Sequence, residues 1–158
     1  MCIGKTGNAQ SSNYSIQANI IYQIRKYINW PADKKTGDFV IGIIGDSPLF
    51  EELKKATANK TAGGQKIVIK QFSSSQSSFD CQILFIAEDE SNSLKQINAE
   101  TQAMPILIIT ERDGLAKKGS CINFIIEDER IKLEINENNI AKRNRKAASE
   151  LLGLGNII

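Results

Sequence analysis

Few residues of this sequence have the types and spacing that catalysis needs. The chain contains 20 basic and 18 acidic residues but no histidine. Histidine is the commonest general base, the usual partner of a catalytic serine or cysteine, and the commonest metal ligand. Its absence argues against hydrolytic and metal-dependent chemistry, so we predict no catalytic residue, no metal site and no cofactor.

Three cysteines, Cys2, Cys81 and Cys121, offer the only thiols. None of them forms a Cys-x-x-Cys pair, which excludes a zinc ribbon and a thioredoxin-like motif. Cys81 and Cys121 each border an apolar run. Two interpretations stay open for this pair: buried free thiols, or a disulfide in an exported protein.

Asp46, Asp89 and Thr110 stand at the ends of three successive apolar runs, in the order that a receiver domain requires. In such a domain one aspartate accepts a phosphoryl group. The lysine that should follow the last strand is missing, because Glu127 and Asp128 occupy that place. A receiver-like phosphoacceptor domain therefore remains an alternative and is not the leading hypothesis.

Residues 42–46, Gly-Ile-Ile-Gly-Asp, end an apolar run and precede a predicted helix, the position where α/β proteins bind ligands. Ser47 and Pro48 follow, which breaks both the dinucleotide fingerprint and the Walker loop. The segment is explained by a tight turn from strand to helix. A small-ligand receptor that uses the crevice beyond Asp46 and Ala87 is a further alternative.

Hydrophobic periodicity predicts the elements that carry these residues. Apolar residues at helical spacing predict a first helix that is capped by Asn13 and ends before Pro31. Later elements are predicted as strands at 39–44, 66–72, 82–87 and 105–110, with helices near 47–56 and 93–103. Runs 122–126 and 131–135 predict an antiparallel hairpin, and Asn136 predicts the cap of one final helix through Leu151.

This order predicts a three-layer α/β/α sandwich with a mostly parallel sheet and a C-terminal antiparallel hairpin. The 158 residues fit one domain, which we place at 14–158. Residues 1–13 are expected to be a disordered N-terminus or a signal-peptide remnant, because Gly7-Asn8-Ala9 has the small-x-small form of a cleavage site. A net charge of +2 argues against nucleic-acid binding, and no apolar run approaches the ~20 residues of a membrane span.

Two surfaces are candidates for binding another protein. The first is the end of the first helix, with Tyr22, Tyr27, Trp30 and Pro31. The second is a basic cluster on the predicted final helix, formed by Arg143, Arg145 and Lys146. For the cluster, a solvated helix face is the plainer interpretation, and an acidic partner is the functional one.

The ordered motifs of the chain resemble those of the YfiR-like family. Ile21-Tyr22-Gln23-Ile24, leading to Ile28-Asn29-Trp30-Pro31, is similar to the opening signature of that family, an aromatic-containing helix that ends in Trp-Pro. Segments 39–46, 79–86, 105–110, 119–136 and 149–152 resemble its later strands, hairpin and last helix. The family often has a cysteine in its first strand where this chain has Gly42 or Ile43, so a bridge from Cys81 to that position cannot form.

This resemblance implies an exported, periplasmic homodimer without enzymatic activity. Its best-understood relatives bind the periplasmic domain of the membrane-bound diguanylate cyclase YfiN and repress it, which controls cyclic di-GMP output and biofilm formation. We therefore predict a non-enzymatic regulator in the periplasm. Its partner would be the extracytoplasmic domain of a membrane-bound diguanylate cyclase or sensor kinase, with no direct insertion into the membrane.

Overall fold

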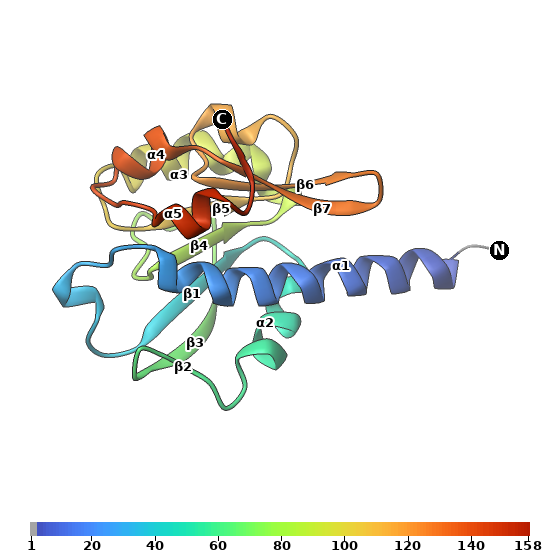
Figure 1. Cartoon of the computed structure of the whole chain (residues 1–158), viewed down its shortest axis with the longest axis horizontal. Coiled ribbons are helices and arrows are strands. Elements are labelled where there is room, and N and C mark those ends of the chain that lie inside the picture. The colour runs from blue at the N-terminus through green and yellow to red at the C-terminus, as the bar shows by residue number, and fades with distance from the viewer. Residues whose placement is uncertain (1–2) are drawn as a thin grey trace.

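The fold is one mixed β-sheet with helices packed on it, shown in the computed structural model of Figure 1. The structure describes the backbone of residues 3–158 and the side chains of residues 13–158. Within that part the sheet has eight strands in the order β2-β3-β1-β4-β5-β6-β7-β8. Their bounds are β1 Phe39–Ile44, β2 Thr61–Ala62, β3 Gln65–Phe72, β4 Ile83–Ile86, β5 Leu107–Thr110, β6 Ile122–Glu127, β7 Arg130–Ile135 and β8 Asn156–Ile157.

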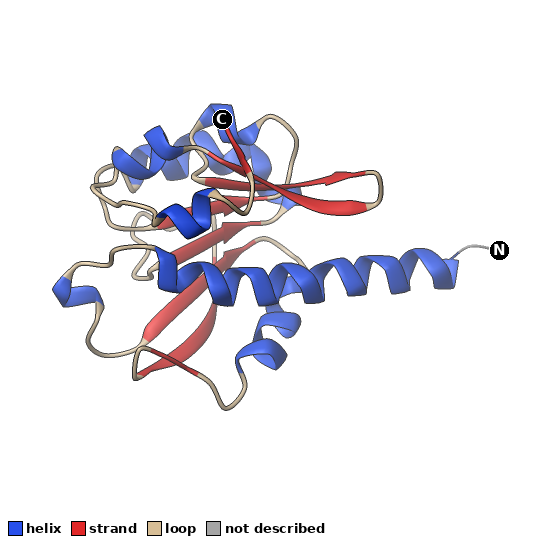
Figure 2. Cartoon of the chain, in the orientation of Figure 1, coloured by secondary structure: helices blue, strands red, loops and turns tan. Residues whose placement is uncertain are grey.

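Five neighbouring strands, β3-β1-β4-β5-β6, run parallel and form the centre of the sheet. Strands β4 and β5 are buried at every position, as expected of parallel strands covered on both faces. The chain order reverses between β1 and β4, which is the switch point where doubly wound sheets bind ligands. Strands β6 and β7 form an antiparallel hairpin, and β7 pairs in parallel with β8 (Figure 2).

The helices connect these strands and cover them. Their bounds are α1 Ile3–Ile24, α2 Leu49–Thr57, α3 Leu94–Glu100, α4 Glu137–Ala141 and α5 Ser149–Leu152. Short 3-10 turns lie at η1 Arg25–Tyr27, η2 Ala32–Lys34, η3 Glu88–Ser93 and η4 Leu115–Lys118. Helix α1 packs against α2 and touches β7, so it crosses the sheet between the two ends of the strand order (Figure 1). No helix in the described residues is long and apolar enough to cross a membrane.

The α/β class, the mostly parallel sheet and the C-terminal hairpin are confirmed. The three-layer arrangement and the limits of the domain stay predictions. The prediction of one final helix is wrong, because the chain leaves the helix after α4 and α5 begins only at Ser149. Asn144 has a φ of 55°, a left-handed conformation that a helix cannot contain. Helix α1 also begins at Ile3, so Asn13 lies inside it and is not its cap.

Gly42, in the middle of β1, lies against the aromatic ring of Phe72 on the neighbouring strand β3. A Cβ atom at Gly42 would lie 2.4 Å from Phe72 Cε2 and 2.5 Å from Phe72 Cδ2. The Phe72 ring is itself held edge-to-face against Phe79, with 5.7 Å between the ring centroids. Glycine is therefore required here by the close approach of a side chain that has little room to move.

We predict that Gly42→Ala lowers the free energy of unfolding by about 1–3 kcal/mol, because the added methyl overpacks the contact with Phe72. Gly153→Ala is the matched control. Gly153 has a φ of −75°, and a Cβ there meets nothing closer than 3.6 Å. The control should be neutral or stabilising by up to about 1 kcal/mol. Urea unfolding followed by circular dichroism measures both variants, and an equal loss in the two would contradict this packing.

Candidate partner-binding surface

Trp30 closes the end of α1 against the start of β1. Its indole Nε1 donates a hydrogen bond of 2.8 Å to the backbone carbonyl of Arg25. Its ring packs edge-to-face on Phe39, with 5.5 Å between centroids and an interplanar angle of 80°. Pro31 follows in an extended conformation, so the chain leaves the helix direction directly after the tryptophan. The Trp-Pro pair therefore fixes how the helix is connected to the sheet.

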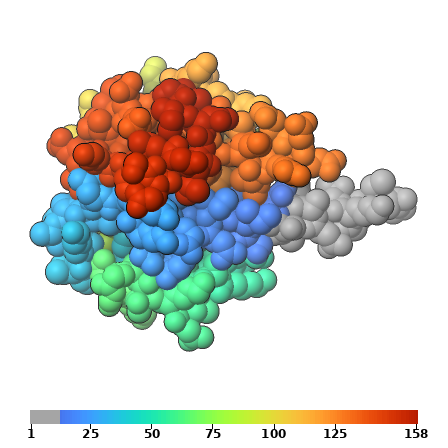
Figure 3. Space-filling view, viewed as in Figure 1, coloured from blue at the N-terminus to red at the C-terminus, as the bar shows by residue number. Residues whose placement is uncertain are grey.

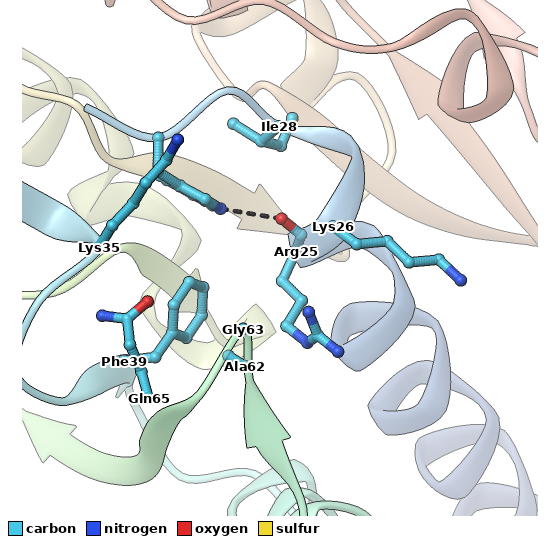
Figure 4. A pocket seen from close by; sticks show the side chains of 9 residues that line it. Arg25, Lys26, Ile28, Lys35, Phe39, Ala62, Gly63 and Gln65 are labelled. Carbon is cyan, nitrogen blue, oxygen red and sulfur yellow. Dashed lines mark hydrogen bonds between the residues drawn. The ribbon is translucent and has the colours of Figure 1, made fainter. Parts of the chain in front are cut away.

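Beside Trp30 lies a small pocket of about 270 Å³ with a cationic rim (Figure 4). It is lined by Arg25, Lys26, Ile28, Trp30, Lys35, Phe39, Ala62, Gly63 and Gln65. Figure 4 shows the Arg25 side chain extending toward the turn at Gly63, whereas Lys26 points away from Phe39. The Nε atom of Arg25 is buried and has no hydrogen-bond partner among the described residues. The pocket thus combines an aromatic floor with positive charge and one unused donor.

Tyr22 anchors the same helix to strand β2 and is stacked between two cations. Its hydroxyl donates a hydrogen bond of 3.2 Å to the carbonyl of Thr61. The guanidinium of Arg25 lies 4.4 Å from the ring centroid, and the ammonium of Lys60 lies 4.9 Å from it. Cation–π contacts of this kind hold long side chains in place at a surface. The end of α1 therefore presents ordered cations beside half-buried aromatic rings.

The end of α1 is joined to the segment before α5 by backbone pairing. Ile28 forms an isolated antiparallel bridge with Ala147. The amide of Asn29 donates to the carbonyl of Lys146 at 3.2 Å, and the amide of Ala148 donates to the carbonyl of Tyr27 at 2.8 Å. Figure 3 shows the two segments side by side in the space-filling view. Residues 27–29 and 145–148 are called the junction below.

Side chains reinforce the junction. The amide of Lys146 donates to Asn29 Oδ1, and Arg145 Nη1 donates to the carbonyl of Asn29. The ammonium of Lys26 lies 5.1 Å from the centroid of the Tyr27 ring. A shallow pocket of about 270 Å³ lies over these residues, and no carboxylate lines it in the described part of the chain. The junction thus brings Tyr27 of the first predicted surface beside Arg145 and Lys146 of the second.

Arg143 does not join this surface. Only 3% of the residue is exposed, and its guanidinium is turned toward α3. The sequence placed it on one helix face with Arg145 and Lys146, but the chain turns at Asn144 and separates them. Arg145 is half-buried and Lys146 is exposed, so these two are the members of the predicted basic cluster that a partner can reach.

The receiver-like alternative rests on Asp46, Asp89 and Thr110. These residues lie at the carboxyl ends of β1, β4 and β5. The backbone amide of Asp46 donates to Asp89 Oδ2 at 3.3 Å, and Ala87 lies next to them, its amide bonded to the carbonyl of Ile44. Thr110, however, is fully buried, and its hydroxyl is hydrogen-bonded to Ser120 and Asn123. That hydroxyl is therefore not free to contact a phosphorylated Asp89. In the described part of the chain, no three cysteine, aspartate or glutamate residues are grouped so that they could hold a metal ion.

Glu111 is a half-buried carboxylate at that edge and ties α1 to it. Tyr14 donates its phenolic proton to Glu111 Oε1 at 2.8 Å, and the amide of Glu88 donates to Glu111 Oε2 at 2.9 Å. Burial raises the pKa of Glu111, and the two hydrogen bonds lower it in part. Burial, with the charge of Glu111 beside it, also raises the pKa of Tyr14. The contact is a structural clamp that holds α1 across the strand ends.

Cys81 and Cys121 are buried and free. They precede β4 and β6, and β5 lies between these strands. Two strand spacings amount to about 9.6 Å, beyond the roughly 7 Å over which Cα atoms can be bridged. The disulfide considered for this pair is therefore incompatible with the strand order. Desolvation raises the pKa of the Cys81 thiol to about 12 and also raises that of Cys121.

A comparison with protein-family models matches residues 14–156 to the YfiR/HmsC-like family. The chain belongs to the YfiR/HmsC-like family. The match begins at Tyr14, takes in the Trp30-Pro31 turn and ends within β8, so it covers the junction and strands β1 to β7. A search of curated proteins found no match to the chain. The resemblance read from the ordered motifs is thus confirmed at the level of the family.

Several residues that build the surface were not singled out from the sequence. Arg25 and Lys26 are ordinary helix residues in the sequence, and only the packing of Trp30 shows that they rim a pocket. Asn29 carries three of the junction bonds, through its amide, its carbonyl and its side chain. Its position directly before Trp30-Pro31 was the only sign in the sequence that Asn29 could matter, and it did not indicate the contact with residues 145–148.

We predict that Asn29→Ala lowers the free energy of unfolding by about 1 kcal/mol, because the Lys146 amide loses its side-chain acceptor. Amide exchange should accelerate in residues 145–148 while the central strands stay protected. Asn19→Ala is the control, since the Asn19 side chain donates only to the carbonyl of Ser15 on the exposed face of α1. Hydrogen exchange by mass spectrometry measures both. Unchanged exchange at 145–148 would contradict the proposed function of Asn29 in the junction.

We also predict that Cys81 and Cys121 resist iodoacetamide in the native protein at pH 8. With a pKa of about 12, only about one Cys81 thiol in ten thousand is ionised at that pH, and the thiolate is the form that reacts. Labelling should rise with pH and become complete in guanidinium. Peptide mass spectrometry assigns the label to each residue. A native Cys81–Cys121 cross-linked peptide would contradict the strand order.

Proposed function

We propose that this chain is a non-enzymatic regulator that is exported to the periplasm and binds the extracytoplasmic domain of a membrane signalling protein. Membership of the YfiR/HmsC-like family supports this, because the family is known for regulators and not for enzymes. The partner would be a YfiN-type membrane-bound diguanylate cyclase or a sensor kinase, held in its inactive state. The resemblance further implies that the regulator acts as a homodimer.

The observation that carries the proposal is the ordered cationic and aromatic character of the junction and the adjoining helix end. Tyr27 and Trp30 are half-buried aromatic residues, and Lys26 and Lys146 are exposed cations beside them. Aromatic residues fixed by packing, with charge at the rim, are typical of binding hot spots. The pockets along this surface have no carboxylate in their described linings. The complementary partner surface would therefore be acidic with an apolar centre.

Repression would follow from selective binding to one conformation of the partner. A ligand that binds the inactive conformer more tightly than the active one shifts the population toward inactivity. To move an equilibrium from about 99% active to about 99% inactive requires a preference of about 10⁴-fold. A rigid surface serves this purpose well, because little entropy is lost when it binds. The hydrogen bonds of Asn29 and Trp30 give the surface that rigidity.

The test is the affinity of the partner's periplasmic domain for charge-reversal variants. Lys26→Glu combined with Lys146→Glu should weaken binding by about 30-fold or more, because like charges would face each other across the interface. Lys54→Glu combined with Lys66→Glu is the control. Both control lysines are exposed and lie on α2 and β3, so the net charge changes equally at a different place. Calorimetric titration measures the three proteins.

The control should bind within about threefold of the unaltered protein, since long-range charge effects are screened at physiological salt. An equal loss in both pairs would contradict the location of the surface. If the unaltered protein does not bind the partner's domain at micromolar concentration, the proposal that this chain is a regulator of that partner is wrong.

A further inference from the structure

A second cationic region lies away from the junction, in a groove between α3, η4 and the end of α4. Its volume is about 720 Å³, within the range typical of ligand sites. Lys95, Asn98, Ala99, Gln102, Ala103, Lys117, Lys118, Gly119, Asn139, Lys142 and Arg143 line it. Three separate segments of the chain therefore contribute positive charge to one concave surface.

The lining of this groove is one-sided in charge. Four lysines line it, and no aspartate or glutamate does so in the described part of the chain. None of Lys95, Lys117, Lys118 and Lys142 takes part in an ion pair within residues 13–158. All four are exposed, and Asp113 lines only the adjoining pocket that Lys95 and Lys118 share. Four cations without a paired carboxylate raise the local concentration of anions at the groove.

Arg143 adds a buried cation to the groove wall. Its Nη1 donates to the carbonyl of Thr101 at 2.9 Å, and its Nη2 donates to Asn98 Oδ1 at 2.6 Å and to Thr101 Oγ1 at 3.1 Å. All three acceptors are neutral, and no carboxylate in the described residues lies within ion-pair distance of the guanidinium. Burial lowers the pKa of Arg143. Buried charges are ordinarily paired, so this guanidinium lacks the counter-ion that its burial calls for.

The shape of the groove depends on Gly119. This glycine ends η4 with a φ of +118°, in the left-handed region that favours glycine. A Cβ there would lie 2.7 Å from Asn98 Nδ2. Glycine thus lets the end of η4 approach α3 closely, and Lys117 and Lys118 of η4 line the same groove as Lys95 of α3. The lysines surround one cavity because of this approach.

The neutral residues of the lining indicate the class of ligand. Asn98, Gln102 and Asn139 supply amide groups, and the remaining neutral residues are alanines and a glycine. No aromatic ring lines the groove in the described part of the chain, so a nucleobase would find nothing to stack on. We propose that the groove binds a small, hydrophilic anion with several negative charges, such as a sugar bisphosphate or a short polyphosphate.

The test uses the full chain with two probes, fructose 1,6-bisphosphate and sodium tripolyphosphate, in calorimetric titrations at 0.15 M salt. Both probes carry several phosphate charges. In fructose 1,6-bisphosphate a sugar separates the phosphate groups, and in tripolyphosphate the phosphate groups are joined directly. The groove variant is Lys95→Gln with Lys118→Gln and Lys142→Gln. The control variant is Lys54→Gln with Lys66→Gln and Lys70→Gln, three exposed lysines outside the groove. Thermal unfolding of each variant checks that it remains folded.

The groove variant should lose about tenfold or more in affinity for the probe that binds, because three charge-assisted hydrogen bonds are removed. The control should change by less than about threefold, because charges at a distance from the groove are screened at this salt concentration. Preference for one probe identifies the spacing of the charges. Equal losses of affinity in the groove and control variants would overturn the proposal. It would also be overturned if neither probe bound with a dissociation constant below about 1 mM.

Discussion

The backbone pairing of Ile28 with Ala147 joins the end of the first helix to the segment before α5. The candidate surface depends on this pairing. Both residues are buried, so the pairing is shielded from water. Each of its hydrogen bonds contributes about 0.5–1.5 kcal/mol net, but leaving one of these groups unpaired would cost more. The pairing therefore fixes α1 at its C-terminal end, and the Tyr14–Glu111 contact fixes it near its middle.

The same turn of chain serves both cationic regions. Lys142 and Arg143 line the groove beside α3, and Arg145 and Lys146 belong to the junction. The left-handed Asn144 stands between the two pairs and directs them to different surfaces.

Most of the sheet could be predicted from the sequence, because continuous apolar runs such as 39–44 and 105–110 indicate buried strands. The hairpin was equally clear, since Glu127 and Arg130 bound a short polar turn between two apolar runs. The split of the last helix could not be predicted, because it depends on long-range pairing with Ile28. The two-residue strand β8 has too little sequence to show periodicity, and it exists only because β7 offers an edge.

The site followed the same division. Trp30 and Pro31 stood out at the end of a predicted helix, and they became informative together with the ordered strands that follow them. Arg143 looked like its basic neighbours, and only the fold shows that it is buried. Cys81 and Cys121 allowed a disulfide until the strand order set β5 between them. The burial of Arg143 and the separation of the two cysteines depend on contacts between distant segments, which the local sequence pattern does not predict.

We propose that the junction and the end of α1 form the surface that contacts a protein partner. Hydrogen exchange of the unaltered protein tests this location, measured with and without the extracytoplasmic domain of the proposed membrane partner. Binding should slow exchange in residues 22–30 and 145–148 and leave the exposed part of α2 unchanged. Protection confined to α2 and β3, with none at the junction, would contradict it.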